Sequence, residues 1–274
     1  IPVTSVERVL ASQSELIDRI YRTAGVSRDE FATRYEPAIR NLARYVHLLP
    51  ATDTKNHSGA GGLFRFALEI GLYSLQTANA SVFPVGGGVE RRFHLTPKWS
   101  LATVLAGICC QLYRTVGTMV ILNGKQDQWQ PLLTPLYDWS VAMDTKRYFI
   151  RWLEDRNKSG AQASSSYVVN LIVPAKIMQY IATDNNLVLE AMSAAIAGGV
   201  SADNPILEII NPITSRVVVE DGKRSLRNYG HMMVGTHLEP HLIDAMLRLV
   251  KTGVWTWNNR NAVIWIGADG VFID

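Results

Sequence analysis

The sequence predicts a mainly α fold, in which a helical bundle is followed by a small C-terminal α/β annex. Two observations predict the bundle: apolar residues recur at helical spacing before residue 47, and long apolar segments follow at 63–78 and 99–116. A third predicts the annex, because β-prone runs flank a turn at 261–273. The chain has 274 residues, 47% of them hydrophobic, and is long enough to bury a large core.

The N-terminal segment predicts two amphipathic helices that pack as a hairpin. Thr4 and Glu7 have the spacing of a capping box at the start of a helix over 4–22. Ser27 and Glu30 repeat that spacing at the start of a second helix, which stops at the sequence HLLP. The apolar residues share one face of each helix, so both helices are expected to serve packing.

The middle of the chain predicts the central helices of the bundle. The glycine-rich turn SGAGG leads into 63–78, which is apolar on nearly every side and therefore typical of a central helix. A loop is predicted over 81–98, and the next helix over 99–116. Two more are predicted at 164–183 and 187–197, with the first kinked or split at Pro174.

The predicted domains are a helical domain at 1–215, a linker at 216–236 and an annex at 237–274. The linker sequence SRVVVEDGKRSLRNYG is polar and is expected to be exposed and partly extended. In the annex, the helix PHLIDAMLRLVKTG closes at Gly253, and a hairpin with Asp269 and Gly270 in its turn follows. A helix followed by a hairpin is compatible with a winged-helix-like module, here cut before its end.

The stretch LATVLAGICCQLYRTVG at 101–117 could be a membrane span, a redox pair or the remains of a metal site. Its uncharged run ends at Arg114 and is shorter than the about 20 residues that a span needs. Burial of Cys109 and Cys110 on an apolar helix would raise the pKa of both thiols and favours inert packing. Adjacent cysteines cannot frame a disulfide scaffold.

We therefore expect a buried helix, no membrane span, and a cytoplasmic protein with free thiols. No signal peptide is recognisable at the start of the chain. The chain begins at Ile1 rather than Met and ends abruptly, so we expect it to be a fragment of a longer polypeptide.

Common catalytic and nucleic-acid signals are weak. The SGAGG turn lacks the lysine of a Walker loop, the six histidines form no HExxH motif, and no GxSxG elbow occurs. Residue patterns alone thus predict no catalytic residue, metal or cofactor. The net charge of +3 is too small to indicate nucleic-acid binding by itself.

Several segments together carry a family resemblance: YVHLLPAT with NHSGAGGLFRFALEIGLYS, RRFHLTPKWSLATVLAGICCQLYRT, WQPLLTPLYDW and RYFIRW. In order and spacing they resemble the N-terminal domain of the TraI-type relaxases of the MobH class, which belong to integrating conjugative elements and related plasmids. The resemblance extends from Pro2 to Ile273. It implies DNA and proteins of the conjugation machinery as partners.

That family resembles the HD superfamily of metal-dependent phosphohydrolases, which implies an HD-like helical bundle. The superfamily holds its metal with a histidine in an RHSLE stretch and a His-Asp pair in LAGLLHDIGK, and the metal activates water for attack. The matching positions here are Phe66, Cys110 and Gln111, while His57 remains from an HHxGxGG stretch. The last acidic ligand falls near Asn211.

The resemblance therefore implies a pseudo-active site, formed by His57, Phe66, Cys110 and Gln111, whose metal ligands are degenerate. Phenylalanine has no donor atom, and a neutral glutamine replaces the carboxylate that a hard cation prefers. One cysteine and one histidine are too few for a stable site.

Basic clusters are the remaining functional signal. The nucleic-acid-binding candidates are Arg91, Arg92, Lys98, Lys223, Arg224 and Arg227. Basic residues also flank the aromatic residues of 148–152, where arginines between aromatic rings could hold a single strand. The alternative, favoured by the sequence at 148–152, is a solvated basic face with the aromatic rings in the core.

The function predicted from these features is DNA binding or scaffolding in DNA transfer by a catalytically inactive HD-like domain. Two alternatives stay open. One is an active relaxase or nuclease whose catalytic groups lie elsewhere in the full-length protein. The other is a ligand-sensing module that keeps the old pocket for a nucleotide.

Overall fold

The structure is a computed structural model that describes residues 1–54, 56–83, 88–153, 161–183, 186–198, 203–231, 246, 249–250, 252–259, 262, 264–267 and 270–273. The described chain is mainly helical, which confirms the predicted fold class. It forms two compact units, Ile1–Gly222 and Lys223–Asp274.

Each of the two predicted N-terminal helices is a pair of shorter helices. The first pair is α1 (Val6–Ala11) and α2 (Ser14–Ala24), and the second is α3 (Arg28–Arg34) and α4 (Glu36–Val46). The Ser27–Glu30 capping box is confirmed at the start of α3. The cap of α1 is Ser5 rather than the predicted Thr4.

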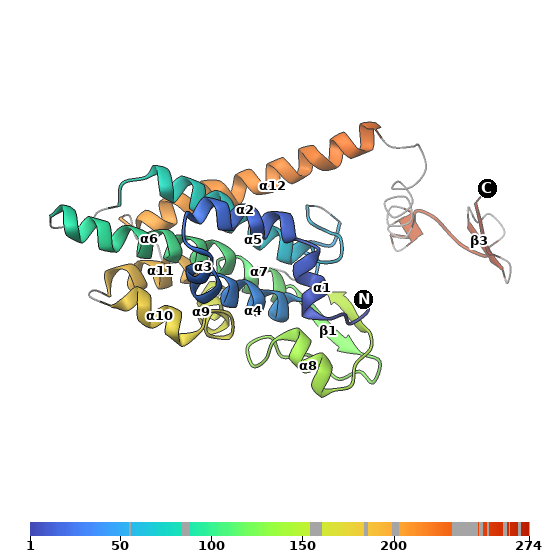
Figure 1. Cartoon of the computed structure of the whole chain (residues 1–274). Helices are drawn as coiled ribbons and strands as arrows, with labels where there is room; N and C mark the ends of the chain where they lie inside the picture. The colour runs from blue at the N-terminus through green and yellow to red at the C-terminus, as the bar shows by residue number, and fades with distance from the viewer. Residues whose placement is uncertain are drawn as a thin grey trace. The chain divides into compact units, whose positions relative to one another are not determined.

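The centre of the first unit is built by α5 (Gly62–Ala80) and α6 (Val89–Cys109), which pack against each other (Figure 1). Nearly every side of α5 is buried, as its apolar composition predicted. The helix α6 begins ten residues before the predicted start at Trp99 and contains Pro97, so the loop predicted over 81–98 is wrong from Val89 onward. A short helix, α7 (Leu112–Val116), follows.

Two glycines allow α5 and α6 to approach each other closely. A Cβ atom at Gly107 would lie 3.2 Å from the Cα atom and 3.3 Å from the backbone nitrogen of Gly71. A Cβ atom at Gly71 would lie 2.7 Å from the Ile108 side chain. Since the atoms opposite Gly107 are mainly backbone, they cannot rotate away from a larger side chain.

A two-stranded antiparallel ribbon, which the sequence did not predict, follows α7. Its strands are β1 (Met119–Asn123) and β2 (Tyr148–Trp152), and α8 (Leu136–Ala142) lies between them in the chain. The register pairs Met119 with Trp152 and Asn123 with Tyr148. The ribbon therefore joins segments that are about 30 residues apart in sequence.

The remaining helices of the first unit agree closely with the prediction up to residue 197. They are α9 (Ala161–Ile172), α10 (Ala175–Ala182) and α11 (Leu187–Ala197), and Pro174 separates the first two as predicted.

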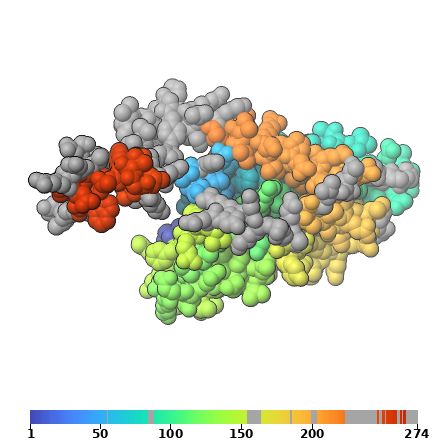
Figure 2. Space-filling model, turned by 180° about the vertical axis from the view of Figure 1, so that it is seen from behind, coloured from blue at the N-terminus to red at the C-terminus, as the bar shows by residue number. Residues whose placement is uncertain are grey.

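The final helix is α12 (Pro205–His231), part of which runs across the face seen in Figure 2. The partly extended conformation predicted for the linker is therefore wrong over 216–231, which is helical. The division into 1–215, 216–236 and 237–274 stays a prediction.

The second unit contains the predicted hairpin, with strands β3 (Ile264–Gly267) and β4 (Gly270–Ile273) paired antiparallel. Gly253 has a φ of +73°, which suits its predicted place after a helix. Asp269 and most of the predicted helix before Gly253 lie outside the described residues. The winged-helix-like character of the annex stays a prediction.

Among the described helices, none combines the length and the apolar composition needed to span a bilayer.

We expect Gly107→Val to lower the free energy of unfolding by about 2–3 kcal/mol, because the added methyl groups would push α5 and α6 apart. Urea denaturation of purified protein measures this. Gly124→Val is the matched control, since no atom lies within 4 Å of its Cβ position, and its effect should stay within about 0.5 kcal/mol. If Gly107→Val and Gly124→Val lowered the free energy of unfolding equally, a close contact between α5 and α6 at Gly107 would not explain the loss.

Candidate functional site

His57 lies in the loop between α4 and α5, and tight backbone contacts hold it there. Its carbonyl oxygen accepts a hydrogen bond from the backbone N–H of Ala51 at 2.9 Å. A Cβ atom at Gly62 would lie 1.9 Å from the same oxygen, so this position admits only glycine. The SGAGG turn thus serves the packing of the loop that carries His57.

The His57 side chain is enclosed between two carboxylates. Its Nε2 atom lies 3.0 Å from Oε2 of Glu69 on α5, and its Nδ1 atom lies 3.4 Å from Oδ2 of Asp221 on α12. The backbone N–H of His57 also donates to Asp221, at 2.8 Å. Arg65 donates to the second oxygen of Glu69 at 3.1 Å. We call His57, Glu69 and Asp221 the His57 cluster.

Burial makes the His57 cluster a structural link between elements far apart in sequence. The side chains of His57 and Glu69 are only 1% and 3% exposed. Unpaired polar groups at such depth are costly, so His57 and Glu69 stabilise each other through the contact at Nε2, while Asp221 holds the loop through the backbone N–H of His57. The cluster therefore fastens the loop and α12 to the central helix α5.

Phe66 contacts His57, the residue with which the sequence analysis grouped it. The two ring centroids are 5.1 Å apart, with the rings tilted by 50°. Phe66 is buried on α5 and fills the space beside the imidazole. The structure thus brings together this half of the predicted set.

Cys110 and Gln111 form the other half, at the junction of α6 and α7. Burial raises the pKa of the Cys110 thiol to about 12, although hydrogen bonds with the side chains of Thr214 and Gln111 partly offset this effect. The thiol donates to the carbonyl oxygen of Gly107 at 3.3 Å. Burial also raises the pKa of the Cys109 thiol, further than that of Cys110.

The residues at these positions do not fit a metal of the HD type. Both ring nitrogens of His57 face carboxylates, Cys110 stays protonated near neutral pH, and a thiolate is the form of cysteine that ligates metals. Within the described part of the chain, no group of three His, Cys, Asp or Glu side chains is arranged to hold an ion. The side chains at these positions pack against and form hydrogen bonds with their protein neighbours.

The acidic residue that faces His57 was missed by the sequence analysis. The family pattern places the last acidic ligand near Asn211, whereas Asp221 lies ten residues further along α12. Asp221 falls in the segment that the sequence predicted as an exposed linker. Once that segment is helical, Asp221 can be turned toward His57.

A family model described as "Putative helicase", TraI_2, matches residues 2–274. The chain belongs to the TraI_2 family. Membership confirms the TraI-type, relaxase-like resemblance and its conjugation context. No curated protein matches the chain.

In this TraI_2 member, the basic candidates from the sequence fall into three groups. Arg91 and Arg92 are exposed on α6. Lys98 is only 5% exposed, and its ammonium donates to the carbonyl oxygen of Thr183 at 2.6 Å, so the expectation that Lys98 contacts phosphate is wrong. The third group, Lys223, Arg224 and Arg227, lies on α12, with side chains outside the described residues.

The aromatic residues of β2 do not all lie in the core. Tyr148 is buried, and its hydroxyl lies 3.0 Å from Nδ1 of His47. Phe149, the next residue, is 56% exposed. Arg147 and Arg151 are exposed on the same side of the strand as Phe149. The interpretation that all the aromatic rings are buried is therefore wrong for Phe149.

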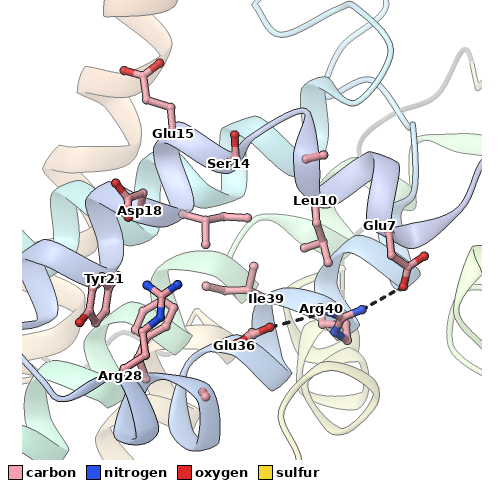
Figure 3. A pocket seen from close by; sticks show the side chains of 14 residues that line it. Glu7, Leu10, Ser14, Glu15, Asp18, Tyr21, Arg28, Glu36, Ile39 and Arg40 are labelled. Atoms are coloured by element: carbon pink, nitrogen blue, oxygen red, sulfur yellow. Dashed lines mark hydrogen bonds and ion pairs between the residues drawn. The ribbon is translucent and has the colours of Figure 1, made fainter.

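A cavity of about 660 Å³ lies between α1, α2, α3 and α4 (Figure 3). It combines apolar side chains with several carboxylates at its edges. The sequence analysis missed it, because the apolar faces of these helices indicated only packing against each other. We call this cavity the α1–α4 groove.

We expect Glu69→Ala to lower the free energy of unfolding by about 2–4 kcal/mol, since it leaves His57 buried beside an empty space and removes the partner of Arg65. The measurement is urea denaturation at pH 7. Asp18→Ala is a matched control, because Asp18 pairs with Arg22 at the same helical spacing on an exposed surface, where the loss should be below about 1 kcal/mol. A small effect at Glu69 would show that the cluster does not hold the fold.

We also expect neither thiol to react with Ellman's reagent at pH 8 while the protein is folded, since both are buried and protonated. Both cysteines of the chain should react once urea unfolds it. A Ser12→Cys variant, with its thiol at an exposed position, provides the positive control. Rapid reaction of Cys110 in the native protein would instead indicate an open, ionised site.

Proposed function

We propose that this chain is a catalytically inactive, HD-like module of a TraI-type protein, of the MobH class, from an integrating conjugative element. In this proposal it works in the cytoplasm, where it binds single-stranded DNA during transfer. Family membership supports the conjugation context. The alternation of residues along β2 is the observation that carries the DNA-binding part.

Along β2 and the residue before it, arginine, phenylalanine and arginine occur at alternate positions 147, 149 and 151. Side chains two residues apart in a strand point to the same side. With Tyr148 turned into the core, Arg147, Phe149 and Arg151 all face solvent. Across the ribbon, Leu122 is paired with Phe149. We call Arg147, Phe149 and Arg151 the β2 strip.

The chemistry of the β2 strip suits a single strand better than a duplex. An exposed aromatic ring offers a stacking surface for a base that is free of pairing, and arginines on both sides can contact successive phosphates. The green and lime part of the surface in Figure 2 belongs to the segment with α8 and the ribbon, which is accessible from this side. Such contacts should show little preference for DNA sequence, because neither stacking nor phosphate contacts involve the hydrogen-bonding edges of the bases.

The lack of catalysis is proposed from the same residues that form the His57 cluster and its neighbours. Phe66 has no donor atom and packs on His57, while Cys110 is held protonated by burial. A nuclease of the HD type needs metal ligands where this chain has packing contacts. The proposed DNA contact uses the β2 strip and does not require Arg91 or Arg92, which the sequence analysis also named as candidates.

Phe149→Ala should weaken binding of a labelled 20-nucleotide oligo-dT about tenfold in fluorescence anisotropy, the effect of losing one stacked base. Arg151→Ser should reduce the slope of log affinity against log salt by about 1, because one phosphate contact is lost. Lys176→Ser on α10 removes another exposed positive charge, far from β2 in sequence, and should change neither quantity.

Unchanged affinity in both β2 variants would refute the DNA-binding proposal. Cleavage of the oligonucleotide by the purified chain with Mn²⁺ or Mg²⁺, abolished by His57→Ala, would refute the proposed inactivity. It would show instead an active nuclease whose catalytic groups include His57, rather than one whose catalytic groups lie elsewhere in the full-length protein.

A further inference from the structure

The first two turns of α6 extend beyond the helical bundle (Figure 1). Every residue from Val89 to His94 is exposed. Val89 and Phe93 are 84% and 80% exposed, although both are large and apolar. They lie four residues apart and share a helix face with Arg92. We call residues 89–94 the α6 tip.

Such exposure is unusual for a formed helix. Large apolar side chains gathered at one surface usually mark a contact with another molecule. Arg91 and Arg92 form no ion pair within the described part of the chain, so their charges are available to a partner. The α6 tip is thus an apolar projection with a net positive charge, as its two arginines outweigh Glu90.

The α1–α4 groove is a hollow with an apolar floor in which such side chains could lie. Leu10 and Ile39 point into it from opposite walls (Figure 3). At one end Tyr21 and Phe31 meet edge to face, with centroids 5.1 Å apart. Leu10, Ile17 and Tyr21 are only half-buried, so apolar surface remains for a ligand to cover.

The groove also has the complementary charge. Its lining holds four carboxylates against two guanidinium groups, a formal net charge of −2, from Glu7, Glu15, Asp18, Glu36, Arg28 and Arg40. Arg40 is already engaged by Glu7 at 3.1 Å and Glu36 at 3.7 Å. On α2, Asp18 already pairs with Arg22, whereas Glu15 forms no ion pair within the described part of the chain, so Glu15 is the carboxylate that an approaching cation would meet at this edge.

We propose that the chain associates with itself head to tail, with the α6 tip of one copy seated in the α1–α4 groove of the next. Val89 and Phe93 cover the apolar floor, and Arg92 approaches Glu15. This is the recognition of a helix by a groove, in which residues at helical spacing act as anchors. In this proposal Arg91 and Arg92, which the sequence analysis predicted to bind nucleic acid, belong to a protein–protein contact.

The two surfaces are different patches of the first unit, so the contact is heterologous. Each pair leaves one free tip and one free groove, and assembly can continue beyond a dimer. A helix tip buries little area, and small interfaces are weak. We therefore expect association at micromolar or higher concentration, strongest at low salt.

Mixing two variants tests this proposal. Phe93→Ser disables the tip, and Glu15→Lys with Asp18→Lys disables the groove. In light scattering after gel filtration, the mass of the unmodified chain should rise with concentration, while each variant alone stays monomeric. An equimolar mixture should give a 1:1 dimer and nothing larger, because only one intact tip and one intact groove meet.

The controls separate this contact from misfolding and from DNA binding. Phe93 is exposed, so Phe93→Ser should leave the melting temperature unchanged. Tyr167→Ser and Glu190→Lys, an exposed aromatic and an exposed acid elsewhere, should associate like the unmodified chain. Phe149→Ala should also associate normally, even if it loses DNA affinity.

Three results would each overturn the proposal. The first is an unmodified chain that stays monomeric at every concentration tested. The second is a mixture of the two variants that forms no dimer, and the third is a Phe93→Ser variant that associates as the unmodified chain does.

Discussion

The close contact between Gly71 and Gly107 is the constraint on which the rest of the first unit depends. Without side chains at these two points, α5 and α6 can pack backbone to backbone. The loop with His57 leads into the start of α5, and Cys110 follows the end of α6. The spacing of the two central helices thus sets where His57 and Cys110 lie.

The sequence predicted those features that depend on neighbouring residues. The Ser27–Glu30 capping box, the break at Pro174 and the helix Leu187–Ala197 are all local, and all are confirmed. The β1–β2 ribbon was missed because its strands are short and their pairing spans a long stretch of chain. The early start of α6 was missed because Pro97 is normally a sign of a helix boundary.

The candidate site was predictable only in part, because a sequence indicates contacts between neighbouring residues better than contacts between distant ones. The family pattern located His57 and Phe66, whose contact follows from nearby positions in the chain. Asp221 comes from 164 residues away and meets His57 only through the path of α12. Burial makes the partners of such a histidine necessary to the fold.

Pro97 divides α6 into two parts with different local stability. Since proline has no N–H, the carbonyl oxygen of Phe93 lacks its usual backbone donor, and residues 89–94 before it are exposed to solvent. From Trp99 to Cys109 every residue is buried in the core. Amide protons before Pro97 should therefore exchange through local opening, whereas those after Trp99 should exchange only when the whole unit unfolds.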